Sequence, residues 1–164
     1  VERDFEGKPC SYTWWLDNIW VTEAERRDKG IKPPTSDFWT DQLNIIRVYD
    51  QLIYNTDRNQ GNLLITPEWK VWMIDHTRAF RAESKLLKPD MLKRCDARLL
   101  TAIRNLNTVS LKQQLGPWLR PEEISALLNR RALIVAHYEK EIREHGEDSV
   151  LTGIARKTPQ VSVP

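Results

Sequence analysis

Apolar residues recur every three or four positions in two long stretches of the chain, and the first stretch predicts a helix over residues 37–54. Ser36 or Asp37 can cap its start, and the polar run that begins at Asn55 ends it. The apolar positions that share one face are Trp39, Leu43, Ile46, Tyr49 and Ile53.

The C-terminal half carries the second helical pattern, whose end signals are stronger. Pro121 occupies a first turn, Glu122 and Glu123 follow it at the positive end of the helix dipole, and Gly146 lies just past the last turn. A further apolar periodicity runs over residues 86–106. We therefore expect one helix over 86–106 and a second that begins at Pro121.

Between these helical regions the pattern changes to two short apolar runs. Residues 63–66 and 69–74 are separated by Pro67-Glu68, which favours a turn, so the sequence predicts a β-hairpin. Paired strands lie less than about 5 Å apart. The hairpin would therefore return Asp75 toward Asn62.

Composition narrows the classes of protein that these elements can form. The chain has 164 residues, 40% of them hydrophobic, a mean hydropathy of −0.57 and a net charge of +2, which fit one packed domain. Its basic residues are scattered, so we expect no nucleic-acid partner. Its apolar runs are far shorter than the roughly 20 residues of a membrane span. Cys10 and Cys95 form neither a CxxC pair nor a disulfide framework, which favours a cytoplasmic location.

The chain divides into three parts by composition. Residues 1–36 form an aromatic-rich segment that we expect to be helical or irregular, residues 37–154 form the main body, and residues 155–164 form a polar tail that we expect to be disordered. Trp14 and Trp15 are candidates for a surface that docks a protein partner. The tryptophans expected in the core are Trp39, Trp72 and Trp118.

The polar loop after the first helix carries the candidate chemistry. Asp57 can orient a hydroxyl and accept its proton during phosphate transfer. Magnesium prefers hard oxygen ligands and takes only one or two from protein, so Asn62 and Asp75 suffice as metal ligands. Arg58 could neutralise the acidic groups or pair with a phosphate. Each residue alone is an ordinary loop residue, but their combined spacing around a hairpin favours function.

Two runs in this region resemble known kinases. Asp57-Arg58-Asn59-Gln60-Gly61-Asn62 resembles the catalytic loop of the phosphatidylinositol 3/4-kinase-like families, and Asn55-Thr56-Asp57 with Asn62 is similar to HipA-type bacterial kinases. The metal-binding turn of those families resembles the run Ile74-Asp75-His76-Thr77-Arg78-Ala79-Phe80. In Arg78 and Phe80 this run also resembles the metal-binding turn of the secreted Golgi casein-kinase family.

The resemblance implies that residues 37–154 are the helical C-lobe of an atypical protein-kinase-like fold, mostly α with a small β-hairpin. It implies that Asp57 is the catalytic aspartate, that Asn62 and Asp75 bind Mg²⁺, and that ATP donates phosphate to a hydroxyl of a protein, lipid or small molecule.

Two departures from the family pattern keep a second reading open. Asn59 stands where the lipid-kinase-like pattern has histidine, and His76-Thr77 replaces the usual Phe-Gly. No glycine-rich turn with a strand lysine precedes residue 37, so we expect a C-lobe without its N-lobe, which alone would catalyse little. The alternative is a catalytically inactive kinase-like module that binds a partner through Trp14 and Trp15.

Overall fold

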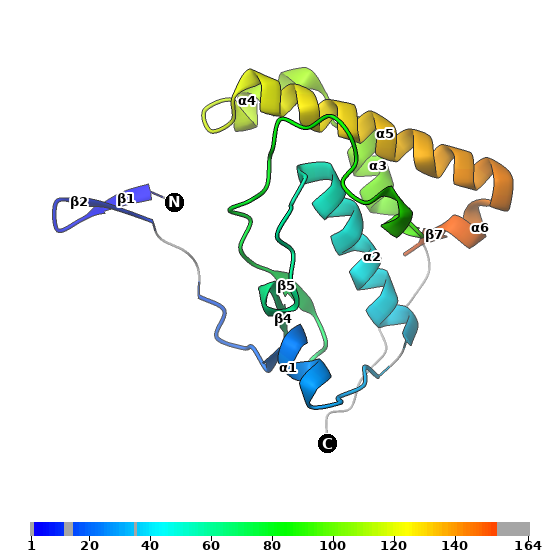
Figure 1. Ribbon diagram of the computed structural model, residues 1–164, viewed down its shortest axis with the longest axis horizontal. Helices are drawn as coiled ribbons and strands as arrows, with labels where there is room; N and C mark the ends of the chain where they lie inside the picture. The colour runs from blue at the N-terminus through cyan, green and yellow to red at the C-terminus, as the bar shows by residue number, and fades with distance from the viewer. Residues whose placement is uncertain (1, 12–14, 35, 154–164) are drawn as a thin grey trace.

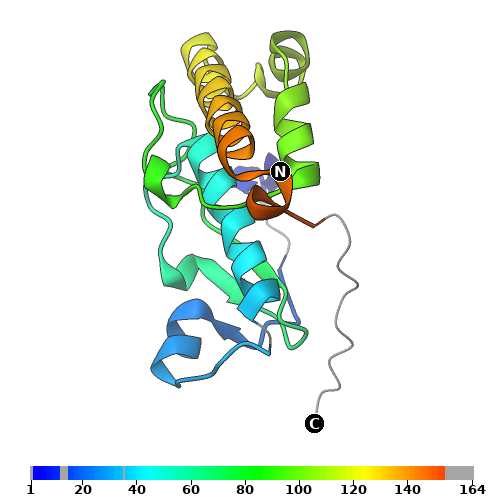
Figure 2. The same cartoon turned by 90° about the vertical axis from the view of Figure 1, so that its right-hand side faces the viewer.

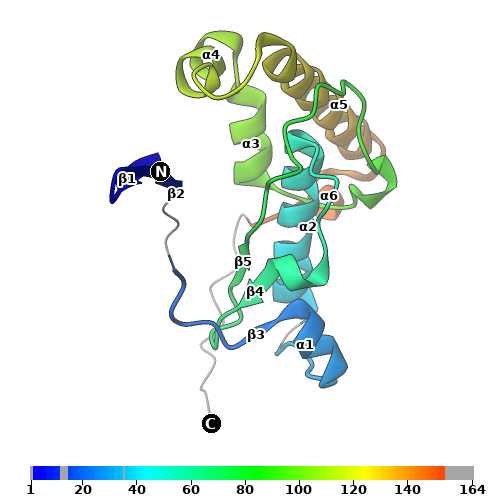
Figure 3. The ribbon, with the colours of Figure 1, turned by 60° about the vertical axis from the view of Figure 1, so that its left-hand side comes forward.

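The computed structural model describes residues 2–11, 15–34 and 36–153, and this part of the chain is mostly α-helical with small sheets. A long helix, α2 (Ser36–Ile53), runs through the middle of the molecule (Figure 1). A three-stranded sheet and the short helix α1 (Glu23–Asp28) lie beside one half of α2, and the other helices gather around its opposite half (Figures 1 and 3). Within the described ranges, every helix lacks the length or the apolar character needed to cross a membrane.

The first predicted helix is confirmed to within one residue at each end, because α2 occupies Ser36–Ile53. The helix is buried on two sides. Trp39 packs toward the sheet, while Val48 and Leu52 pack toward the other helices. A helix enclosed on two sides also buries polar positions, which must then find partners. The buried polar residues of α2 are Asn44, Asp50 and Gln51.

The predicted β-hairpin is also confirmed. Strands β4 (Leu63–Ile65) and β5 (Val71–Met73) pair antiparallel, with Leu63 opposite Met73. An additional strand, β3 (Val21–Thr22), pairs with the other edge of β4 and ties the N-terminal segment to the main body. The small apolar core that fixes this sheet to α2 consists of Val21, Trp39, Ile65 and Trp69.

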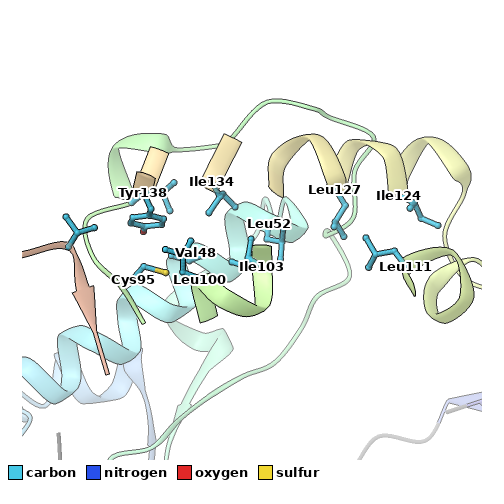
Figure 4. Close-up of a cluster of buried hydrophobic side chains, with 12 residues drawn as sticks. Val48, Leu52, Cys95, Leu100, Ile103, Leu111, Ile124, Leu127, Ile134 and Tyr138 are labelled. Carbon is cyan, nitrogen blue, oxygen red and sulfur yellow. The ribbon is translucent and has the colours of Figure 1, made fainter. Parts of the chain in front are cut away.

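The described C-terminal half contains helices packed around the other half of α2. Its elements are β6 (Cys95–Asp96), α3 (Ala97–Asn105), α4 (Thr108–Leu115), α5 (Pro121–His145), α6 (Glu147–Val150) and β7 (Leu151–Thr152), with β6 parallel to β7. Helix α5 begins at Pro121 and ends before Gly146, as predicted, and it contacts α2, α3 and α4 (Figure 2). The main hydrophobic core lies between these helices (Figure 4).

The helix predicted over residues 86–106 is wrong in its first half. Only Ala97–Asn105 is α-helical, and the preceding stretch contains a 3₁₀ turn, η2 (Pro89–Met91), and the short strand β6. Lys88 precedes a proline, which disfavours helical backbone at that position. The side chain of Asp96 then accepts hydrogen bonds from the backbone amides of Arg98 and Leu99, so α3 begins at residue 97.

Two of the three tryptophans predicted for the core are exposed instead. Trp39 is buried, whereas Trp72 lies on the outward face of β5 and Trp118 lies in the turn between α4 and α5. Side chains alternate between the two faces of a strand, and the inward positions of the hairpin belong to Leu63 and Ile65. An apolar pattern alone does not show which face of a sheet is covered.

The N-terminal segment contains a hairpin that we did not predict from the sequence. Strands β1 (Glu2–Phe5) and β2 (Lys8–Ser11) are joined by Glu6 and Gly7, which both have positive φ, as a tight type I′ turn requires. This hairpin stands apart from the helical body (Figure 3). Of the predicted docking residues, Trp15 is 80% exposed. Trp14 and the tail over 155–164 lie outside the described residues.

Candidate functional site

The loop that carries Asp57 is attached to the end of α2 through a buried amide. The Asn55 backbone amide donates to the Asp50 carbonyl at 2.9 Å, and Asn55 Nδ2 donates to Asp50 Oδ1 at 3.2 Å. Asn55 Oδ1 then accepts from the Asp57 backbone amide at 3.1 Å. The residue before it, Tyr54, has a φ of 53°, so the chain leaves the helix in a sharp turn. The position of Asp57 is therefore fixed from inside the fold.

Arg58 connects the parts of the site through its guanidinium group. Nε and Nη2 donate to the buried Asp50 carboxylate at 3.0 and 3.1 Å, and Nη1 donates to the carbonyls of Asn62 and Ile74 at 3.2 and 2.7 Å. Nη2 also lies 2.9 Å from His76 Nε2. Arg58 thus holds α2, the loop and the end of β5 together. The pairing of Arg58 with a phosphate stays a prediction.

Asp57 presents its carboxylate to solvent at the front of this loop. Its side chain is 47% exposed, and Oδ2 lies 3.5 Å from Nε of Arg78, which is exposed too. An ion pair between two exposed side chains contributes little stability and opens easily. A hydroxyl group that approaches Asp57 would therefore meet an accessible carboxylate beside a movable cation.

The hairpin register brings Asn62 next to Asp75. Leu63 is opposite Met73, and the backbone amide of Ile74 donates to the Asn62 carbonyl at 3.1 Å, so Asp75 is the residue directly after the partner of Asn62. Asn62 Nδ2 donates to the Asp57 carbonyl at 3.3 Å. Because a carbonyl can only accept, this bond fixes the orientation of the amide and leaves Oδ1 as its ligand atom.

Asp75 has an uncommon backbone conformation that its own side chain stabilises. Its φ is 55°, and Oδ1 accepts from the backbone amide and the hydroxyl of Thr77 at 3.2 and 2.7 Å. These two hydrogen bonds lower the pKa of Asp75, and the nearby Arg58 cation lowers it further. The exposed carboxylate is therefore ionised at neutral pH, in the state that a hard cation prefers.

An apolar platform adjoins these two residues. Leu64 is opposite Trp72 in the hairpin, so both side chains lie on one face of the sheet, and Ile74 follows two residues later on the same face. Trp72 is 49% exposed and Ile74 is 38% exposed, although both are large apolar residues. The outward face of the sheet therefore offers a flat apolar surface beside Asn62 and Asp75.

The segment after Asp75 is anchored by Arg130, a fully buried residue of α5. Its guanidinium donates to the Leu52 carbonyl at 2.8 Å and to the Arg81 carbonyl at 3.1 Å, it also donates to the Glu83 carbonyl, and it lies 5.4 Å from the ring centre of Tyr54. One buried arginine thus joins the end of α2 to residues 81–83.

His76 lies between Arg58 and the aromatic ring of Tyr49. Its Nε2 faces Arg58 Nη2, a donor, and its ring meets Tyr49 edge-on at 6.0 Å between centroids. Burial lowers the pKa of His76, and the cation of Arg58 lowers it further, against the opposing effects of Asp50 and Asp75. The neutral imidazole, accepting at Nε2, fits this position.

We expect the fold to lose stability in mild acid through His76. Its folded pKa lies below the unfolded value of about 6.5, so the unfolded chain binds more protons between those two values and stability rises with pH across that interval. One group gives a slope of at most about 1.4 kcal/mol per pH unit. Urea unfolding between about pH 5 and about pH 7.5 measures it.

His76→Gln keeps an acceptor for Arg58 without a proton to bind near neutral pH, so this change should flatten the slope. The exposed His145 serves as the matched control, and His145→Gln should leave the slope in place. Equal slopes in the wild-type protein and His76→Gln would contradict the expectation.

The structure adds residues to the site that the sequence pattern did not single out, and two of them had a detectable signal. Asp50 lies between Ile46 and Ile53 on the apolar face of α2, and Arg130 lies between Leu127 and Ile134 on that of α5. A charged residue on the apolar face of a helix must find a buried partner. Arg78 carried no such signal, because its position beside Asp57 depends on the path of a loop.

The three residues predicted as base and metal ligands thus lie on two loops joined by hydrogen bonds, with Arg58 behind them. No protein-family model and no curated protein matches this chain, so an assignment of function depends on its residues and their geometry.

Proposed function

We propose that this chain is the C-lobe of an ATP- and magnesium-dependent phosphotransferase that acts on a hydroxyl group. The observation that supports the proposal is the hydrogen bond from the Ile74 backbone amide to the Asn62 carbonyl, which brings the backbone of Asp75 close to that of Asn62, whose side-chain amide donates to the Asp57 carbonyl. A base and two oxygen ligands for a cation are the groups that a phosphotransferase supplies from this side of its active site.

Each residue has a definite part in this proposal. Asp57 orients the acceptor hydroxyl and takes its proton, which the exposed carboxylate can do once Arg78 moves aside. Asn62 and Asp75 would hold magnesium through one amide oxygen and one carboxylate, a donor set that fits this ion. When bound, magnesium neutralises phosphate charge. The face formed by Leu64, Trp72 and Ile74 would receive the nucleobase.

Binding of a nucleotide analogue in the presence and absence of Mg²⁺ tests the proposal most directly. A non-hydrolysable ATP analogue titrated calorimetrically should bind more tightly with magnesium than without it. Asp75→Asn and Asn62→Ala should each weaken the magnesium-dependent binding by at least about tenfold, or about 1.4 kcal/mol. The titration applies to this chain and to any longer natural product that contains it.

A second acidic group in the molecule provides the control. Glu141, Glu144 and His145 cluster at the exposed end of α5 and could take up a divalent cation unspecifically. Glu144→Gln should therefore leave the magnesium-dependent nucleotide binding unchanged. If Glu144→Gln weakened that binding as much as Asp75→Asn does, the site at Asn62 and Asp75 would be refuted.

The alternative is a kinase-like module that binds a protein partner without turnover. The observation that favours it is Trp15, whose indole is 80% exposed. Trp14, the other half of the predicted surface, lies outside the described residues. The same titration separates the two functions, because a module of this kind would bind the analogue with equal strength with and without magnesium.

A further inference from the structure

A second recess lies on another side of the loop that carries Asp57. It is an open cleft of about 540 Å³ between α1, α2 and loop residues Arg58, Asn59 and Gln60. This volume lies in the range of small-molecule sites. Of the described residues, those that line the cleft do not include Asp57, Asn62 or Asp75. The cleft is therefore separate from the candidate phosphotransfer site, although it shares a loop with it.

One wall of the cleft is apolar. The apolar residues that line the cleft are Leu43 and Ile46 of α2, Leu63 of β4, and Met91, which is 42% exposed. Methionine is unbranched and adapts its shape to what it contacts. This wall can pack against a compact apolar group such as an aromatic ring.

The two carboxylates that line the cleft are already neutralised. Glu23 is buried and pairs with both Arg26 and Arg27, at 2.6 and 2.7 Å. Asp50 is buried and holds Arg58 through two hydrogen bonds. Three guanidinium cations thus face two carboxylates, so neither acid attracts a further cation to the cleft.

Arg47 adds a further cation to the lining of the cleft. It lines the cleft half-buried, and its guanidinium donates to the Asn44 side-chain oxygen, a neutral acceptor, at 2.9 Å. Among the residues that the structure describes, no carboxylate forms an ion pair with Arg47. A guanidinium presents a planar fork of donors that matches carboxylate and phosphate groups. The charge of the cleft and the chemistry of Arg47 both favour an anion.

We propose that this cleft binds an organic anion, a carboxylate or phosphate carried on a compact apolar group, with Arg47 as its counter-charge. The apolar group packs against Leu43, Ile46 and Met91, and the anionic group meets Arg47. Gln60, which is exposed on the loop, supplies further amide donors at the same cleft. This site stands on its own contacts and does not depend on phosphate transfer at Asp57.

Three probes of similar size test the proposal on the unmodified chain. Phenyl phosphate, phenylacetate and neutral benzyl alcohol are titrated while amide resonances are followed by nuclear magnetic resonance. The anions should bind at least about tenfold more tightly than the alcohol, shift the amides of Asn59, Gln60 and Met91, and bind more weakly in added salt. The ratio of the two anion affinities distinguishes a phosphate ligand from a carboxylate ligand.

Variants at matched arginines complete the test. Arg47→Gln should reduce anion affinity by about tenfold or more, whereas Arg143→Gln, an exposed change near the end of α5, should leave it unchanged. Equal affinity for the neutral alcohol, shifts confined to other surfaces, or full affinity in Arg47→Gln would each overturn the proposal. Circular dichroism confirms that the variants are folded, and the shifts on the unmodified chain decide the question even if Arg47→Gln does not fold.

Discussion

In a phosphotransferase that contains the proposed C-lobe, Asp57→Asn is expected to reduce phosphate transfer by about a hundredfold to ten-thousandfold, the usual contribution of a general base. Asparagine has nearly the shape of aspartate but cannot take a proton from the acceptor hydroxyl. The Asp57 backbone carbonyl, which binds the Asn62 amide, is unaffected by the change. Magnesium-dependent nucleotide binding should therefore stay within about twofold of the original value while turnover is lost.

Transfer of labelled phosphate from ATP measures the first quantity, and calorimetry measures the second. Asp90→Asn is the matched control, since Asp90 is an exposed aspartate on the η2 turn. It should alter neither quantity. If Asp57→Asn kept more than a tenth of the original rate, Asp57 would not be the general base. If the rate and the nucleotide affinity fell equally, Asp57 would have a structural role only.

Arg130→Met is expected to lower the free energy of unfolding by about 3 kcal/mol. Methionine fills similar space, but the carbonyls of Leu52, Arg81 and Glu83 lose a charged donor. Hydrogen bonds to charged groups contribute about 1.5 to 3 kcal/mol each. Relief of a buried cation offsets part of that loss, because burial also lowers the pKa of Arg130. The free-energy cost of leaving these carbonyls without a donor is larger than the gain from removing the buried cation.

Urea unfolding tests this change, and a lower midpoint with an unchanged slope would show a loss of stability alone. The exposed Arg143 on the same helix is the control, and Arg143→Met should stay within about 0.5 kcal/mol of the original. Hydrogen exchange should also quicken at Phe80, whose amide donates to the Ile53 carbonyl. A loss below about 1 kcal/mol would show that backbone contacts alone hold this segment.

The sequence alone determined the elements whose signals are local. Helix α2, the hairpin of β4 and β5, and helix α5 follow from periodicity, from Pro67 and Pro121 and from Gly146, because these features act within a few residues. The nearness of Asn62 and Asp75 also followed, since a hairpin of that length returns the chain to its starting point.

Only the tertiary structure decided what depends on distant parts of the chain. It made Arg58 an internal connector, exposed Trp72 and buried Arg130 beneath residues 81–83, because each outcome depends on which surfaces other elements cover. It also left Arg47 lining an open cleft with a neutral amide as its hydrogen-bond partner and, among the described residues, without an ion-pair partner. Local propensity names the side chains that can carry charge, but burial and the partners within reach decide how each charge is used.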